Sequence, residues 1–215
     1  YYTLRTYLNA YYDVTVNESP LENVDLGEYD VLIIKIPTKP YPQKVIEKIV
    51  TYVRNGGGLW VIGDHTNVFG STTYLNPLLR NFGLQLRYDG VYHNEHGSYN
   101  SIYTKSLFKH PIIHNVPVFL FATPCSLQVI NPRMRIVVPG LTTKAYALSY
   151  AYKNFFPDPK PDLNIFAGAN TLLAAGDFGR GRVVVFTDST VFSNFFIYLP
   201  GKTELALSII SWLNH

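Results

Sequence analysis

The order of apolar and polar stretches along the chain predicts an α/β domain. Residues 29–36 (YDVLIIKI) and 182–186 (RVVVF) are almost continuous apolar runs rich in β-branched residues, which is typical of strands covered on both faces of a parallel sheet. Residues 43–55 place their apolar side chains along one helical face, and residues 59–62 (LWVI) form the next strand. A strand, a helix and a strand in this order predict a right-handed crossover with parallel strands.

Weaker hydrophobic patterns predict further helices and strands in the rest of the chain, and we interpret residues 1–215 as a single domain. Residues 176–181 (GDFGRG) predict the turn of a C-terminal β-hairpin, and residues 89–135, rich in His, Asn, Gly, Ser and Pro, predict a loop-rich insertion. Further helices are expected at 4–11, 72–82 and 203–213, the last capped by Thr203, and further strands at 13–17, 84–88, 126–130, 136–138, 145–149, 165–167 and 171–175.

Two polar segments follow strands of the predicted sheet, where open α/β sheets bind their ligands. Residues 63–67 (GDHTN) follow LWVI, and residues 187–194 (TDSTVFSN) follow RVVVF. If both strands are central and parallel, the two segments line one cleft. The same residue types also cap helices and form turns, and this alternative stays open. The candidate ligand-binding residues are Asp64, His65, Thr66, Asn67, Asp188, Ser189 and Asn194.

Other chemistry-bearing residues favour structural roles. Cys125 is the only cysteine and precedes a strand instead of starting a helix, so we expect a buried, inert thiol. His93, Glu95 and His96 lack the spacing of the helical zinc motif and lie in a polar segment, so solvated loop histidines are the favoured interpretation. We therefore expect no metal and no cofactor. The 17 tyrosines suggest packing residues, or an aromatic platform for sugar or peptide.

The composition of the chain argues against some classes of partner. The chain has 18 Lys and Arg against 15 Asp and Glu, a net charge of +3 without a basic block, which disfavours nucleic acid. The longest stretch without charged residues, 111–132, is interrupted by prolines and polar residues, so we expect no membrane span in it. Many tyrosines with few charges slightly favour an extracytoplasmic over a cytoplasmic location, which stays open.

Several segments resemble a known superfamily. YDVLIIKIP, GGGLWVIGDHTN, LNPLLRNFGL and GRVVVFTDSTVFSN are similar to segments of the class I glutamine amidotransferase-like superfamily, and in particular of uncharacterised domains found beside membrane segments and transporters. The resemblance covers residues 13–88 and 165–214. It implies a flavodoxin-like, mostly parallel sheet with helices on both faces, within a larger, membrane-anchored protein.

The resembling segments lack the catalytic residues of that superfamily. Catalytic members carry a cysteine at the turn where this chain has Asp64, His65 and Thr66, and a late His-x-Glu pair where it has Thr187, Asp188 and Ser189. Because glutamine hydrolysis needs an activated thiolate, the resemblance implies a pseudoenzyme.

The first hypothesis is therefore a non-catalytic amidotransferase-like domain that binds a small ligand or a partner protein. An alternative is a hydrolase that uses Asp64, His65 and Asp188, with a metal assisting water. A third possibility is a structural module whose tyrosine-rich middle docks a neighbouring domain.

Overall fold

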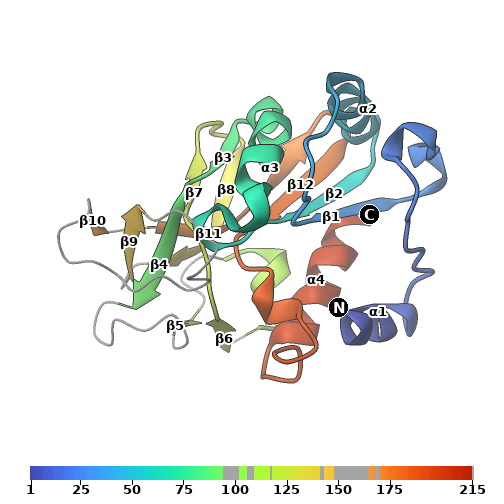
Figure 1. Cartoon of the computed structure of the whole chain (residues 1–215). Helices are drawn as coiled ribbons and strands as arrows, with labels where there is room; N and C mark the ends of the chain where they lie inside the picture. The colour runs from blue at the N-terminus through green and yellow to red at the C-terminus, as the bar shows by residue number, and fades with distance from the viewer. Residues whose placement is uncertain are drawn as a thin grey trace.

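The computed structural model of the chain describes residues 1–93, 102–105, 109–116, 118–140, 143–147, 165–167 and 170–214. These residues form a main sheet of seven strands in the order β1-β2-β12-β11-β7-β3, with β8 also paired to β11 (Figure 1). The strands are β1 (Val31–Lys35), β2 (Gly58–Ile62), β3 (Leu84–Leu86), β7 (Leu127–Val129), β8 (Met134–Gly140), β11 (Asn170–Phe178) and β12 (Gly181–Phe186).

The parallel part of the sheet is formed by its three most apolar strands. β2 lies between β1 and β12 and runs parallel to both, with Trp60 in register with Ile33 and Val184. All five residues of β2 are buried, as its apolar run predicts. Helix α2 (Gln43–Arg54) connects β1 to β2, so the predicted crossover unit is confirmed.

The rest of the sheet is antiparallel, and the expectation of a flavodoxin-like, mostly parallel sheet is wrong. β11 runs antiparallel to β12, to β7 and to β8, and β3 runs antiparallel to β7. The physical reason lies in the connections. β11 and β12 are joined through Gly179 and Arg180 alone, and a parallel pair needs a crossover of a dozen or more residues. The resulting mixed sheet curls into a half-barrel.

Helices cover both faces of the sheet, and each face has its own core. On one face, α1 (Tyr2–Asn9) and α4 (Lys202–Leu213) pack over side chains that include Trp60 and Phe186. On the other, α2 and α3 (Ser71–Leu79) pack over side chains that include Val61. Figure 1 shows α2 and α4 on opposite sides of the strands. Short 3-10 helices complete the chain: η1 (Leu21–Asn23), η2 (Leu26–Glu28), η3 (His65–Gly70), η4 (Arg80–Phe82), η6 (Pro111–Ile113) and η7 (Thr190–Phe192).

The described residues in the middle of the chain include strands that the composition does not suggest. Two small antiparallel sheets form beside the main one, β4-β9-β10 and β5-β6, so the expectation of a loop-rich segment over 89–135 is wrong in part. Their strands are β4 (Asp89–His93), β5 (Ile102–Lys105), β6 (Val118–Phe121), β9 (Thr143–Ala147) and β10 (Ile165–Ala167). Glu95 and His96 lie outside the described residues.

Two local predictions at the chain ends are wrong. Residues 13–17 form no strand, although they alternate in polarity. Helix α4 begins one residue before Thr203 and is preceded by Gly201, whose φ of 82° lets the chain turn into the helix. Among the described residues, no helix combines the length and the apolar character that crossing a bilayer requires.

Candidate functional site

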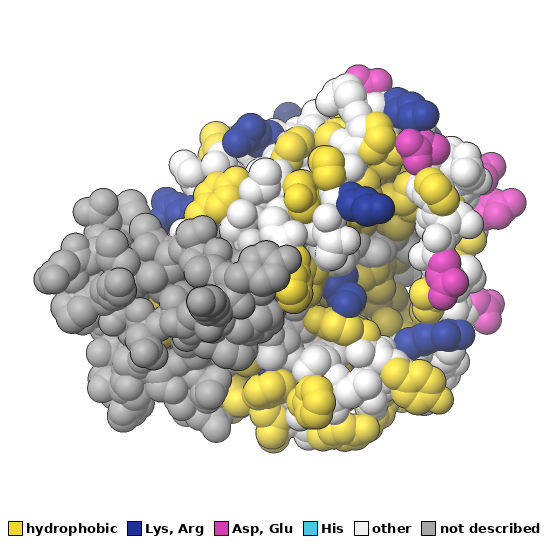
Figure 2. Space-filling view, in the orientation of Figure 1, with side chains coloured by type: hydrophobic (Ala, Val, Ile, Leu, Met, Phe, Trp, Pro, Cys, Tyr) yellow, Lys and Arg dark blue, Asp and Glu magenta, His cyan; other side chains and the backbone are white. Residues whose placement is uncertain are grey.

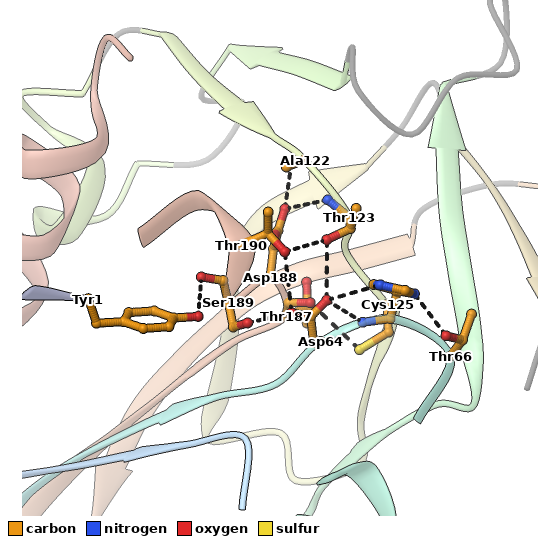
Figure 3. Close-up of polar contacts among 11 residues, drawn as sticks. Tyr1, Asp64, Thr66, Ala122, Thr123, Cys125, Thr187, Asp188, Ser189 and Thr190 are labelled. Atoms are coloured by element: carbon orange, nitrogen blue, oxygen red, sulfur yellow. Dashed lines mark hydrogen bonds and ion pairs between the residues drawn. The ribbon is translucent and has the colours of Figure 1, made fainter. Parts of the chain in front are cut away.

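The two polar segments meet at one rim of the sheet. Because β2 and β12 are parallel neighbours with Ile62 in register with Phe186, the segments that follow them leave the sheet side by side. The hydroxyl of Ser189 donates a hydrogen bond to Oδ2 of Asp64 across the two strand ends (Figure 3). The prediction of a shared rim is therefore confirmed, whereas ligand binding there stays a prediction.

A third segment, directly after β6, completes the cluster. Oδ2 of Asp188 accepts hydrogen bonds from the backbone N–H groups of Ala122 and of Thr123, the latter at 2.8 Å. The hydroxyl oxygen of Thr123 lies 3.2 Å from Oδ1 of Asp64 and 2.8 Å from Oγ1 of Thr190 (Figure 3). We call Asp64, Thr123, Asp188, Ser189 and Thr190 the polar network. Sequence reasoning missed Thr123, because no spacing signal links it to residues about 60 positions away.

Burial governs the charge of the two carboxyl groups. Asp64 and Asp188 are both buried. Burial, reinforced by the negative charge of Asp188, raises the pKa of Asp64 to about 8, so Asp64 holds a proton at neutral pH. Burial also raises the pKa of Asp188, but backbone hydrogen bonds from Thr123 and the ammonium group of Lys202 oppose this shift. The pKa of both carboxyl groups is therefore raised by burial, and the hydrogen bonds and Lys202 oppose the shift at Asp188.

Two lysines flank this pair. Lys202 is fully buried, and its Nζ lies 3.9 Å from the ring centroid of Phe119. Nζ of Lys35, at the end of β1, lies 3.1 Å from the ring centroid of Tyr1. Burial lowers the pKa of each lysine to about 8, while Asp188 opposes the shift at Lys202 and Asp64 opposes it at Lys35. Neither lysine belongs to the two predicted segments, and no pattern in the chain predicts their place beside the two carboxyl groups.

His65 is buried as a neutral imidazole. Burial lowers its pKa to about 4. Its Nδ1 lies 2.8 Å from the hydroxyl oxygen of Thr66, while its Nε2 lies 3.8 Å from Oδ1 of Asp64. The ring thus orients Thr66, and it is neither a charged partner of Asp64 nor exposed to solvent.

Four of the predicted site residues lie outside the polar network: His65 and Thr66, described above, and Asn67 and Asn194. Oδ1 of Asn67 accepts a hydrogen bond from the backbone N–H of Thr73 at 3.0 Å, in the first turn of α3. Asn194 is exposed, and its Oδ1 accepts from the N–H of Thr3 at 3.1 Å. Asp64 also accepts from the N–H of His65 at 2.7 Å. Asn67 therefore satisfies a free backbone N–H group at the start of α3, as the alternative of capping predicts. Asp64 does the same at the start of η3, in addition to its contacts in the polar network.

The backbone at this rim is strained. Among the described residues, four other than glycine have positive φ: Ile36 at 36°, Thr66 at 48°, Asn67 at 56° and Phe69 at 54°. Ile36 follows β1 and the other three follow β2. The left-handed conformation costs an L-residue about 1–2 kcal/mol, and β-branched residues such as Ile and Thr adopt it rarely. Strain of this kind concentrates at functional sites.

Aromatic side chains of the strained loop and of the segment before β4 reach the protein surface. Phe69 is 51% exposed and Tyr88 is 44% exposed. The hydroxyl oxygens of Tyr88 and Thr73 are 3.3 Å apart, and Thr73 is in turn bound to Asn67. We call Phe69, Thr73 and Tyr88 the rim surface.

Cys125 has the inert character that its sequence position predicts. It is buried, and its Sγ donates to the carbonyl oxygen of Thr187 at 3.8 Å. Burial, together with the nearby carboxyl groups of Asp89 and Asp64, raises the pKa of the thiol well above its ordinary value. A thiolate, the reactive form of cysteine, is disfavoured in this position.

Grooves on the described surface lie away from the polar network. One, of about 390 Å³, lies at the amino ends of β1 and β2, between Asp30, Tyr52 and Leu213. Another, of about 510 Å³, is lined by residues that include Tyr12 and Trp212. Within the described part of the chain, no group of three or more His, Cys, Asp or Glu side chains is placed to hold a metal ion.

Fold and site together define an α/β domain with a mixed, curled sheet and a buried polar rim, and solved structures share this architecture. The mmIFT52 N-terminal domain superposes with a TM-score of 0.71 at 17% identity, over 99% of this chain and 89% of that one. Cytoplasmic protein STM3548 from Salmonella typhimurium has a TM-score of 0.55 at 19% identity, over 93% and 76%. A ThuA-like protein from Parabacteroides merdae has a TM-score of 0.57 at 14% identity, over 99% and 83%. Such identities show a common fold alone.

The sequence itself places the chain in a family. Residues 1–210 match a domain of unknown function, DUF4350, and the chain belongs to this family. No curated protein sequence matches it. The resemblance to the class I glutamine amidotransferase-like superfamily is therefore wrong, since the family match and the structural neighbours point elsewhere. That resemblance rested on short segments around β1, β2, α3 and β12, and such segments occur in mixed and in parallel sheets alike.

Proposed function

We propose that this domain is a non-catalytic binding module that contacts a partner protein through the rim surface of Phe69, Thr73 and Tyr88. The observation that supports this most is the strained loop after β2, in which Thr66, Asn67 and Phe69 all have positive φ. A folded protein retains such strain only where the surrounding contacts impose it, and the conformation then has a use.

Buried side chains fix the conformation of the strained loop, residues 66–69. The carboxyl of Asp64 accepts from the N–H of His65, and the buried hydroxyl of Thr66 contacts the His65 ring. On the other side, Asn67 accepts from Thr73 in α3. These contacts fix the backbone on both sides of Phe69 and leave its side chain half exposed. A contact residue that is fixed before binding loses little conformational entropy on binding.

The geometry favours a protein over a small ligand. Asp64 and Asp188 are buried, Oδ2 of each accepts a hydrogen bond from a neighbouring group while Oδ1 of Asp188 has no hydrogen-bond partner among the described residues, and the two grooves described above lie elsewhere. What this rim offers to solvent is a pair of aromatic rings, Phe69 and Tyr88, beside a hydroxyl group. Aromatic anchors of this kind are enriched at the centres of protein interfaces.

The test compares two double variants as bait in extract of the source cells. We expect the unchanged chain to retain a partner, identified by mass spectrometry after cross-linking, and Phe69→Ala/Tyr88→Ala to retain it at least tenfold less. Phe195→Ala/Tyr198→Ala is the matched control, because these rings are also exposed, at 90% and 69%, but lie outside the rim surface. A protein retained equally by all three baits, or no retained protein at all, contradicts the proposal.

A second candidate function, a hydrolase, is supported by one observation. Asp64 and Asp188 form a buried pair in which one carboxyl is protonated at neutral pH, as a general acid requires. The test is a screen for esterase, phosphatase and glycosidase activity, with metal analysis of protein purified without chelator. Turnover that is abolished in Asp64→Asn and in His65→Ala, but not in Phe69→Ala/Tyr88→Ala, supports the hydrolase and contradicts the binding module.

A further inference from the structure

A groove of about 510 Å³ beside helix α4 has the features of a ligand site, and the proposed function makes no use of it. Its walls come from the segment after α1, from η6 and the residues next to it, from the start of β12 and from the C-terminal half of α4. We call it the aromatic groove, because Tyr11, Tyr12 and Trp212 line it. Its volume lies within the range of about 300–1,000 Å³ that is typical of small-molecule sites.

Two of the three rings are fixed in place before any ligand binds. Tyr12 and Trp212 are half-buried, and each packs with part of its surface against the core beneath α1 and α4. Tyr11, in contrast, is 69% exposed. An aromatic ring that is held in this way presents a flat apolar surface, and it loses little conformational entropy when a ligand packs against it.

An arginine of the groove is fixed as well, and part of its guanidinium group has no protein partner. Nη1 of Arg182 donates to the carbonyl oxygen of Trp212 at 2.7 Å, and Cζ of Arg182 lies 4.9 Å from the centroid of the Trp212 ring. Nε donates to Oδ1 of Asp177 at 3.3 Å, but the side chain of Asp177 is 78% exposed, so this pair is weak. Among the described residues, none accepts a hydrogen bond from Nη2. The remaining N–H groups of Nη1 and Nη2 form the fork that binds the two oxygens of a carboxylate.

The charge balance beside the groove is positive. The ring centroids of His110 and Trp212 lie 5.3 Å apart. Burial lowers the pKa of His110, and the positive charges of Arg135 and Arg182 lower it further. Asp177 opposes this shift, so two arginines act on the neutral ring against one aspartate. On the face drawn in Figure 2, Lys and Arg side chains are dispersed instead of forming a basic patch, which disfavours an extended polyanion and leaves a small anionic group as the better match.

Free hydrogen-bonding side chains complete the groove. Asn115, Ser208 and Ser211 line it, and none of these side chains makes a hydrogen bond to another described residue. Ser208 and Ser211 are three residues apart on α4, so they lie on one face of the helix. Hydroxyl and amide groups can both donate and accept hydrogen bonds, so this set matches a ligand that is rich in hydroxyl groups.

We propose that the aromatic groove binds an acidic sugar, a uronic acid unit of an oligosaccharide. Its carboxylate accepts hydrogen bonds from the guanidinium group of Arg182, its hydroxyl groups bond to the serine and asparagine side chains, and its C–H face packs against the aromatic rings. A neutral sugar offers no carboxylate to the arginine, and an acidic peptide offers few hydroxyl groups. This groove is separate from the rim surface, so the inference does not depend on the proposed function.

Titration calorimetry with a panel of uronic acid disaccharides tests the proposal, and the corresponding neutral disaccharides and a glutamate-rich hexapeptide are the comparison ligands. We expect at least one uronic acid disaccharide to bind, and its neutral counterpart and the peptide to bind at least tenfold more weakly. Arg182→Gln should weaken this binding at least tenfold. Arg180→Gln is the matched control and should leave it unchanged, because Arg180 is exposed and does not line the groove. A neutral sugar or peptide that binds as tightly, or no binding of any uronic acid disaccharide at about 10 mM, overturns the proposal.

A second variant separates the loss of binding from a loss of folding. Ser211 is exposed, so Ser211→Phe places a ring over the groove without removing a contact in the core. We expect this variant to keep the Tm of the unchanged chain and to bind at least tenfold more weakly. Tryptophan fluorescence of the unchanged chain locates the ligand, because Trp60 is fully buried and Trp212 lines the groove. A uronic acid that binds without changing this fluorescence, or that binds Ser211→Phe as tightly as the unchanged chain, overturns the proposed site.

Discussion

A buried carboxyl group that keeps its proton is the main electrostatic feature of this protein at the residue scale. Asp64 is surrounded by hydroxyl groups and a second carboxyl, and its protonation avoids two buried negative charges side by side. Burial raises the pKa of Asp188 as well, while backbone N–H groups and Lys202 oppose that shift. The two buried aspartates therefore have different neighbours, although burial raises the pKa of both.

This assignment predicts how stability depends on pH. The carboxyl of Asp64 loses its proton near pH 3.8 in the unfolded chain and near pH 8 in the folded one, so the folded state binds more protons between these values. The contribution of Asp64 to the free energy of unfolding should therefore fall as pH rises from about 4 to 8. Because burial lowers the pKa of His65 from 6.5 to about 4, that group contributes in the opposite direction below pH 6.5, and the net fall should lie mainly between pH 6.5 and 8. Asp64→Asn should flatten this slope, by on the order of 1 kcal/mol or more across the window. Urea unfolding at several pH values measures it.

The control for this experiment is Asp13→Asn, which removes an exposed carboxyl far from the polar network. It should leave the slope unchanged. An Asp64→Asn protein whose stability falls between pH 4 and 8 as steeply as that of the unchanged chain would show that Asp64 is ionised in the folded state.

The sequence allowed part of this site to be predicted. Asp64 and Asp188 follow two apolar strands that are neighbours in the sheet, and strand ends of this kind can be recognised from the pattern alone. Thr123 and Lys202 could not be found in this way. They reach the site through the long-range packing of β6 and α4, which leaves no local pattern in the sequence.

At the element scale, strand positions were more predictable than strand directions. β1, β2, β10 and β12 lie close to the predicted ranges, because apolar runs mark buried strands whatever their direction. The predicted hairpin already required β11 to run against β12, which is incompatible with a mostly parallel sheet. The direction of a strand depends on the length of its connection and on neighbouring strands that are distant in the sequence. Hydrophobic periodicity contains no information on either.

The strained loop after β2 reverses the usual effect of glycine. At Phe69 the φ of 54° strains any residue with a Cβ, alanine included. Phe69→Gly should therefore be more stable than Phe69→Ala by about 1 kcal/mol, the reverse of the order in a helix interior. Thermal and urea unfolding of the two variants measure the difference. An alanine variant at least as stable as the glycine variant would show that the loop is not strained.

Another element, the turn after α3 and η4, depends on a close approach of two backbones. Gly83 has a φ of 72°, and its carbonyl oxygen accepts from the N–H groups of Ile130 and Asn131. A Cβ there would lie 2.4 Å from Cβ of Asn131. Gly83→Ala should therefore lower the free energy of unfolding by about 2–4 kcal/mol.

Chemical denaturation measures this cost, and Gly27→Ala is its control. A Cβ at Gly27 would meet only the side-chain oxygen of Asp25, at 3.2 Å, so the cost there should be under about 1 kcal/mol. Equal losses in the two variants would contradict the role of close backbone approach at Gly83.

At the scale of the whole molecule, one sheet separates two cores and joins distant parts of the chain. The central strands β2 and β12 contribute side chains to both cores, so each helical layer depends on the same strands. The short β4-β9-β10 and β5-β6 sheets extend the domain on one side of this sheet (Figure 1). The family match covers residues 1–210, which include these sheets.

The polar network has a consequence for how quickly the protein unfolds. Thr123 contacts Asp64 and Asp188 across 59 and 65 residues of chain, and such distant groups meet only after the central strands have assembled. Thr123→Val should therefore leave the refolding rate nearly unchanged and speed unfolding by about tenfold, while Thr123→Ser, which keeps the hydroxyl, should change it less. Stopped-flow measurements in urea separate the two rates. In this view, a few hydroxyl and carboxyl groups at the sheet rim determine the lifetime of the native state.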